Sequence, residues 1–129
     1  MNKEFIPYKQ AVALKELGFD EPCFATYNHD KELSRNPSHD IGDLPIEGQP
    51  YYWQNTKIHI SCVASPLYQQ AFRWFREKYD LDNAVLKDRY VIETQEDLPT
   101  WYYGFETYEE AELACLNKLI ELTTNRLRN

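Results

Sequence analysis

The residues best suited to bind a metal form a repeated His–Asp pattern in one part of the chain. The imidazoles and carboxylates concerned are His29, Asp30, His39, Asp40, Asp43 and Glu47. Nitrogen and oxygen atoms of this kind are ligands that divalent metals accept. They all fall in residues 29–50, however, where Pro, Gly, Asp, Asn and Ser accumulate and predict a solvated loop or insert. A structural metal site needs rigidly held ligands, so we expect no metal site here.

The pair that comes nearest to a nucleophile and its base is Cys62 with His59, in the string "HISC". A thiol nucleophile needs a base within hydrogen-bonding distance. Residues 57–63 predict a strand with Ile58, Ile60 and Cys62 pointing inward, which puts His59 on the opposite face. The sequence also contains no Gly-rich phosphate loop and no GxSxG motif. We therefore interpret Cys62 as a core residue and predict no catalytic residue and no cofactor.

Two aromatic runs mirror each other, "YYW" at 51–53 and "WYY" at 101–103. The candidate binding residues in these runs are Tyr51, Tyr52, Trp53, Trp101 and Tyr102. In a strand, Trp101 shares one face with Tyr103 and Phe105, while Tyr102 takes the other. We expect one face to meet the helices and the other to leave Tyr102, with Tyr51 or Trp53, exposed as at protein interfaces. The alternative is an aromatic core in which each buried Tyr keeps its hydroxyl in water.

The string "SPLYQQAFRWFREKYDL" at 65–81 predicts an amphipathic helix with Ser65 as its N-cap and Pro66 as its first residue. Its apolar face holds Tyr68, Ala71, Phe72, Phe75 and Tyr79. Its polar face holds Gln69, Arg73, Arg76, Glu77 and Asp80. An alternative site is a local basic patch for nucleic acid, made of Arg73, Arg76 and Lys78. Single-strand binding needs rings and cations on one surface, and this helix separates them, so we favour nucleic acid less.

Local patterns predict three helices and four strands. The expected helices cover 7–17, 66–80 and a segment that starts at Thr107, and the expected strands cover 22–28, 57–63, 84–94 and 100–106. Gly18 predicts a left-handed helix end, onto which Phe19 folds back. Glu110 completes a capping box with Thr107. The tail from residue 123 onward is expected to fray.

This order of elements predicts an α+β fold. We expect one domain spanning residues 1–129, with a small, mainly antiparallel sheet of about four strands and three helices packed on one face. Each helix opens with a related string, "YKQA" at 8–11, "YQQA" at 68–71 and "YEEA" at 108–111. The echo leaves open whether the two halves are duplicates.

The composition predicts an acidic cytoplasmic protein. The formal net charge is −7 and the isoelectric point is about 4.9, which disfavours diffuse binding to nucleic acid or anionic membranes. An odd number of widely spaced cysteines, Cys23, Cys62 and Cys115, argues against a disulfide framework and for a reducing compartment. The string "MNKEFIPYKQ" lacks the apolar core of a signal peptide, and no apolar run approaches the ~18 residues of a membrane span.

Three distinctive strings occur in a fixed order with a variable middle: "FIPYKQAVALKELGFDEPCFA", "SPLYQQAFRWFREKYDL" and "TYEEAELACLNKLIEL". The combination resembles a group of small uncharacterised proteins encoded by tailed bacteriophages and prophages of the Bacteroidetes, over roughly residues 4–28, 65–81 and 107–122. The resemblance implies an accessory protein inside a bacterial host cell and supplies no activity, cofactor or catalytic residue. The acidic composition, the lack of an assembled catalytic constellation and the surplus aromatics near the sheet edges instead lead us to expect a non-enzymatic protein that binds another protein or itself, with no small-molecule substrate identified.

Overall fold

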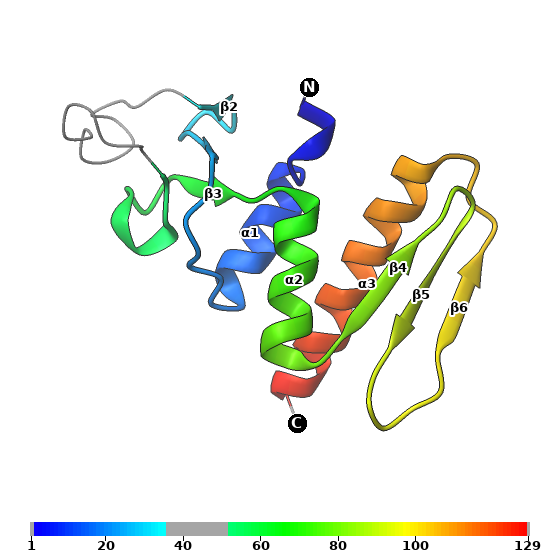
Figure 1. The fold of residues 1–129 in the computed structure, drawn as a ribbon. Helices are drawn as coiled ribbons and strands as arrows, with labels where there is room; N and C mark the ends of the chain where they lie inside the picture. The colour runs from blue at the N-terminus through cyan, green and yellow to red at the C-terminus, as the bar shows by residue number, and fades with distance from the viewer. Residues whose placement is uncertain (1, 36–51, 129) are drawn as a thin grey trace. The chain divides into compact units, whose positions relative to one another are not determined.

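The computed structural model describes residues 2–35 and 52–128. The chain divides into two compact units, Met1–Leu67 and Tyr68–Asn129 (Figure 1). The predicted α+β class is confirmed, because the described residues form three α-helices and two antiparallel sheets of three strands each. The expectation of about four strands in one sheet is wrong, and the expectation of one domain stays a prediction.

The first unit contains helix α1, Tyr8–Glu16, which is preceded by a short 3-10 helix η1, Asn2–Glu4. Its predicted end is confirmed. Gly18 has φ +96°, and the amide of Phe19 donates to the carbonyl of Leu14 at 2.9 Å. This is the bond that satisfies the last carbonyls of a helix closed by a left-handed residue. Phe19 is thereby folded back into the core, where it is buried.

The sheet of the first unit has the strand order β2-β1-β3. The strands are β1, Ala25–Tyr27, β2, Leu33–Ser34, and β3, Val63–Ser65. Both neighbours of β1 are antiparallel to it, and α1 packs against β3. Thr26 at the centre of β1 is fully buried, and its hydroxyl donates to the carbonyl of Val63 at 3.0 Å. That bond removes the cost of an unpaired buried hydroxyl.

The predicted strand at 57–63 is wrong except for Val63, which begins β3, because hydrogen bonds to nearby and to distant residues hold 55–62 in turns. Residues Asn55–Lys57 form the 3-10 helix η2, and the amide of Thr56 donates to the carboxylate of Asp20 at 2.8 Å. The amide of Cys62 then donates to the carbonyl of His59 at 2.9 Å. Ile60, which the alternation pointed inward, is 93% exposed.

The second unit begins with helix α2, Tyr68–Tyr79. The predicted apolar face is confirmed for Tyr68, Ala71, Phe72 and Phe75, which are buried. Tyr79 at its end is half-buried, and Trp74 is buried in addition. The predicted start is wrong. Ser65 is not the N-cap but the last residue of β3, where it is buried and its hydroxyl donates to the carbonyl of Ile6 at 3.1 Å. A bond to a residue 59 positions away has overridden a local capping signal.

The sheet of the second unit is an antiparallel meander with the strand order β4-β5-β6. The strands are β4, Asp82–Val85, β5, Arg89–Glu93, and β6, Thr100–Tyr103. Strands β5 and β6 form an antiparallel hairpin within the segments where strands were expected at 84–94 and 100–106. The single strand predicted at 84–94 is wrong, because the amide of Leu86 donates to the carbonyl of Arg89 and closes a turn there.

Helix α3, Tyr108–Arg128, completes the second unit and packs on β4, β5 and α2. Its predicted start is confirmed, since the amide of Glu110 donates to the hydroxyl of Thr107 at 3.1 Å. The expectation of a frayed tail is wrong for 123–128, which is helical, and Thr123 is fully buried. No helix in the described part of the chain is both long and apolar enough to cross a membrane.

Candidate functional site

The β4–β5–β6 sheet has two unlike faces, and strand register decides which residues lie on each. Tyr90 pairs with Tyr102, and Val91 pairs with Trp101. Because successive side chains of a strand point to opposite faces, these two pairs occupy opposite faces of the sheet. Lys118 of α3 lies 5.7 Å from the ring of Tyr102, so the Tyr90–Tyr102 face is the one that α3 covers.

The inner face is closed by aromatic stacking. The rings of Tyr90 and Tyr102 are 4.7 Å apart and nearly parallel, at 16°. Tyr90 is 4% exposed and Ile92 is 5% exposed. Burial raises the pKa of Tyr90 to about 12, because the phenolate form would lose its hydration. This face is therefore part of the core of the second unit.

The opposite face, hereafter the open face, lies on the side of the sheet away from α3 (Figure 1), and its β4 edge adjoins α2 through Asp82 and Arg76. Its residues are Asp82, Ala84, Arg89, Val91, Glu93, Trp101 and Tyr103. Trp101 is 43% exposed and Tyr103 is 63% exposed, and their rings stack at 6.3 Å with an interplanar angle of 26°. Val91, between Ala84 and Trp101 in the register, is only 8% exposed. The result is a small aromatic platform with an aliphatic centre.

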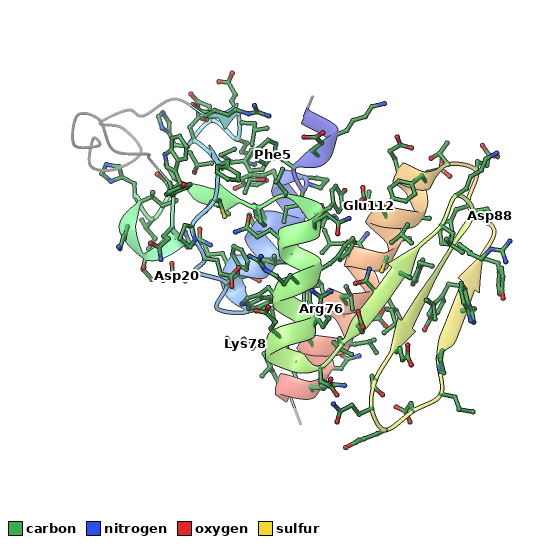
Figure 2. All side chains as sticks on the ribbon, in the orientation of Figure 1. Phe5, Asp20, Arg76, Lys78, Asp88 and Glu112 are labelled. Carbon is green, nitrogen blue, oxygen red and sulfur yellow. The ribbon has the colours of Figure 1, made fainter. Side chains whose placement is uncertain are left out.

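The two ends of the open face carry opposite charge. At the end formed by the β4–β5 turn, the guanidinium of Arg89 lies 5.3 Å from the ring of Tyr103. It also donates to the carboxylate of Asp88 at 2.9 Å, and this bond lowers the pKa of Asp88 (Figure 2). At the other end, Glu93 pairs in register with Asp82, and Asp82 lies 3.8 Å from Arg76 of α2.

For the second aromatic run, the prediction that Trp101 and Tyr103 lie on the same face of the sheet is confirmed, and the prediction that Tyr102 is the exposed ring is wrong. Trp101 and Tyr103 do share a face, and it is the exposed one. Tyr102, which was expected to be exposed, is half-buried beneath α3. Phe105 does not continue the Trp101 row. Gly104 has φ +99°, which breaks the alternation, and the ring of Phe105 lies 5.6 Å from that of Tyr90.

The first aromatic run lies in the first unit and does not form one surface. Tyr51 lies outside the described residues. Trp53 is 1% exposed, and its backbone forms two hydrogen bonds with Cys23 of 2.8 and 2.9 Å, so the expectation of an exposed ring is wrong. Tyr52 is exposed and its ring is 5.6 Å from that of Phe24, which is also exposed. This second aromatic pair provides a comparison for the open face.

The cations proposed for nucleic acid are exposed residues of α2, and Figure 2 labels Arg76 and Lys78 among them. Arg73 is exposed, Arg76 forms the ion pair with Asp82, and Lys78 lies 5.2 Å from the ring of Trp74. Trp74 itself is buried. The expected separation of rings from cations is therefore wrong for Lys78, which also lies 5.6 Å from the ring of half-buried Tyr79. A base could still not stack on the buried indole of Trp74.

The described His and Cys residues do not form a pair of a nucleophile and a base. The ring of His29 lies 3.6 Å from the carboxylate of Asp30, and both side chains are exposed. His39, Asp40, Asp43 and Glu47 lie outside the described residues. His59 is exposed while Cys62 is buried. Burial raises the pKa of Cys23 and of Cys115 to about 12, so both stay protonated thiols at neutral pH.

The described residues offer neither a group of metal ligands nor a cavity of the size that usually encloses a small molecule. Among residues 2–35 and 52–128, no three His, Cys, Asp or Glu side chains are grouped to hold a metal ion. A cavity of about 160 Å³ lies in the second unit between α3 and the β5–β6 hairpin, lined by Ile92, Leu98, Tyr102, Leu122 and Arg126 among others. Pockets that enclose small molecules usually measure ~300 Å³ or more.

Comparison with known proteins returns no match of any kind: no family model, no curated protein and no solved structure matches this chain.

Proposed function

We propose that this protein is a non-enzymatic binding module that uses the open face to engage a protein partner. The observation that carries the proposal is the exposed, stacked pair of Trp101 and Tyr103 beside the nearly buried Val91. Aromatic side chains around an apolar centre are the usual composition of a protein interface. Isolated surface aromatics are ordinary, whereas a contiguous apolar platform indicates an interaction site.

The open face is also prepared for binding before a partner arrives. Its three strands are supported from behind by the Tyr90–Tyr102 stack and by α3. Mutual stacking and the guanidinium of Arg89 restrict the rings of Trp101 and Tyr103. Side chains that are already ordered lose less rotamer entropy on binding, so more of their buried area contributes to affinity.

A protein partner fits this surface better than nucleic acid does. Some RNA-binding domains stack bases on aromatic residues of an open sheet, together with cations that neutralise phosphate. The open face carries one cation, Arg89, and two carboxylates, Asp82 and Glu93. The whole chain has a formal net charge of −7, so it would repel phosphate. The alternative of a nucleic-acid module based on Arg73, Arg76 and Lys78 predicts binding that weakens steeply with salt.

The proposal includes a cellular setting that derives from the resemblance to phage-encoded proteins. We propose an accessory role in the cytoplasm of a bacterial host cell, without a catalytic step. The buried, protonated thiols of Cys23 and Cys115 are compatible with a reducing compartment.

Site-specific photo-crosslinking tests the proposal. A benzophenone amino acid replaces Tyr103 on the open face, and in a matched control it replaces Tyr52, the exposed aromatic of the first unit. We expect illumination in a bacterial cytoplasm to yield protein adducts from position 103 that Trp101→Ser removes. Equal adducts from both positions, or none from position 103, would contradict the proposal. Adducts to nucleic acid would favour the alternative.

A further inference from the structure

We propose that the partner of the open face is a second copy of this chain, packed face to face about a twofold axis. This inference rests on the proposed function of the open face and adds the identity of its occupant. It is carried by the charge pattern of the face, which is complementary to itself in one orientation and not in the other.

The pattern consists of three rows that run across the strands. The first row pairs Arg89 with Tyr103, the second holds Ala84, Val91 and Trp101, and the third pairs Glu93 with Asp82. The face therefore has Arg89 and an aromatic ring at one end, an apolar centre, and Glu93 with Asp82 at the other end. Each end also has a counter-charge beside it, because Asp88 pairs with Arg89 and Arg76 pairs with Asp82. The self-complementarity therefore depends on Arg89 and Glu93, which stand two residues to either side of Val91 on β5.

A twofold axis in the plane of contact can run either across the strands or along them. An axis across the strands, passing through Val91, reverses the strand direction and places Arg89 opposite Glu93 of the other copy, twice. An axis along the strands places Arg89 on Arg89 and Glu93 on Glu93. Like charges placed face to face are unfavourable and opposite charges are favourable, so the first arrangement is selected.

The apolar centre fits the same arrangement. Two sheets that pack face to face lie ~10 Å apart with their strands inclined by roughly 30°. With the axis across the strands, Val91 and Trp101 each meet their own counterpart, so the two most apolar residues of the face leave water together. Arg89 and Glu93 have side chains long enough to meet across that gap at the rim.

The size of the face predicts weak association. Its strands are four to five residues long, so with a spacing of ~4.8 Å the platform measures roughly 15 Å by 15 Å. A standard interface covers about 800 Å² on each partner. We therefore expect a weak, reversible dimer that is populated only at high local concentration.

Reciprocal charge exchange with sedimentation velocity tests this arrangement. The wild-type protein is expected to pass from monomer to dimer between ~1 µM and ~1 mM. Arg89→Glu alone and Glu93→Arg alone each place like charges opposite one another twice, and each is expected to weaken association at least about tenfold. Circular dichroism shows whether each variant is folded.

Two rescue samples make the test independent of the folding of any one variant. The double variant R89E/E93R and an equimolar mixture of the two single variants both restore opposite charges at both contacts. Both are expected to return the Kd to within about threefold of wild type, since ~1.4 kcal/mol corresponds to a factor of ten. Glu77→Arg, on the exposed side of α2, is the matched control and is expected to leave the Kd unchanged.

Three outcomes would overturn the inference: a wild-type protein that stays monomeric at ~1 mM, a dimer indifferent to both single variants, or a mixture that fails to recover. These failures are distinguishable from failure of the proposed function. If the chain is monomeric but position 103 crosslinks to a different protein, the open face binds another partner and only the self-pairing is wrong. If position 103 gives no adduct either, both are wrong.

Discussion

The two faces of the β4–β5–β6 sheet are built from the same three strands and end in different environments. On the inner face, Tyr90 and Tyr102 stack beneath α3. On the open face, Trp101 and Tyr103 stack and remain exposed. Both pairs are aromatic, so composition does not distinguish them. The difference teaches that exposure of a ring follows from the face that the helices take, which puts the inner pair in the core and leaves the outer pair in contact with solvent.

The largest expected effect comes from truncating an inner-face side chain. Ile92→Ala removes a residue that is 5% exposed, and we expect a loss of about 3 kcal/mol in the free energy of unfolding. Trp101→Ser on the open face, though it removes a larger side chain, is expected to cost less than about 1 kcal/mol. Urea unfolding at low protein concentration measures both. Equal losses would contradict the distinction between the faces.

A smaller difference in stability is expected between variants of two neighbouring tyrosines on β6. Tyr102 stacks on Tyr90 of the inner face, and Tyr103 stacks on Trp101 of the open face. Tyr102→Leu keeps most of the buried area but loses the stack on Tyr90, and we expect a cost of about 1 kcal/mol. Tyr103→Leu is expected to cost a few tenths of a kcal/mol, since its ring is exposed. Thermal unfolding of the two variants side by side provides the measurement. A larger loss from Tyr103→Leu than from Tyr102→Leu would reverse the assignment of faces.

Gly104 follows the last residue of β6, and its positive φ breaks the alternation so that Phe105 packs on the inner face. Substitution of Gly104 tests this explanation. An added Cβ would meet no atom within 4 Å, so Gly104→Ala creates no clash, but its φ of +99° disfavours any L side chain. We expect a purely conformational cost of about 1 kcal/mol. Gly104→Asn, which tolerates positive φ better, is expected to cost less. A cost for Ala no greater than for Asn would contradict this explanation.

The smallest expected effect concerns a buried carboxylate on α3. Burial raises the pKa of Glu112, and the hydrogen bond with Tyr108 opposes that shift (Figure 2). A raised folded-state pKa stabilises the protein below the unfolded-state pKa of about 4.3, and this contribution is lost as the pH rises through the folded-state pKa. Glu112→Gln is therefore expected to be more stable than wild type at pH 7 and to lose that part of the pH dependence.

Tyr108→Phe is the companion variant for Glu112. It removes the hydrogen bond that lowers the pKa of Glu112, so the loss of stability between acidic and neutral pH is expected to grow. Thermal unfolding followed from about pH 4 to 8 compares the variants. A pH profile that is the same in wild type and Glu112→Gln would show that Glu112 is not the group responsible.

Much of this fold was predictable because its signals are local. Gly18 ends α1, and Thr107 starts α3, as each motif alone predicts. The apolar face of α2 also follows from helical spacing, with Phe75 fully buried. In each case the physics lies within one or two turns of the chain, so a neighbouring segment does not need to be known.

The predictions that were wrong each depended on a distant partner or on turn hydrogen bonds. Ser65 looks like an N-cap, but its hydroxyl binds the carbonyl of Ile6. Ile60 follows the alternation of a strand but lies in a turn, where its backbone carbonyl accepts a hydrogen bond from the ammonium of Lys15. Neither partner is visible in the local string.

The candidate site was predictable in part. Alternation indicated that Trp101 and Tyr103 share a face, and it could not indicate which face α3 covers. That choice depends on the register between β5 and β6, where Tyr102 opposite Tyr90 completes the core. Tyr103 was therefore missed as a binding residue, although the signal that groups it with Trp101 was present.

Fluorine NMR on protein labelled with 5-fluorotryptophan tests the central claim most directly, because the three indoles differ in environment. Trp53 and Trp74 are buried, and Trp101 lies on the open face. Trp101→Phe assigns its resonance. On raising the protein concentration, we predict that the Trp101 resonance shifts and broadens while those of Trp53 and Trp74 stay in place. A Trp101 resonance that does not change with concentration, or that changes equally in R89E, would contradict self-pairing through the open face.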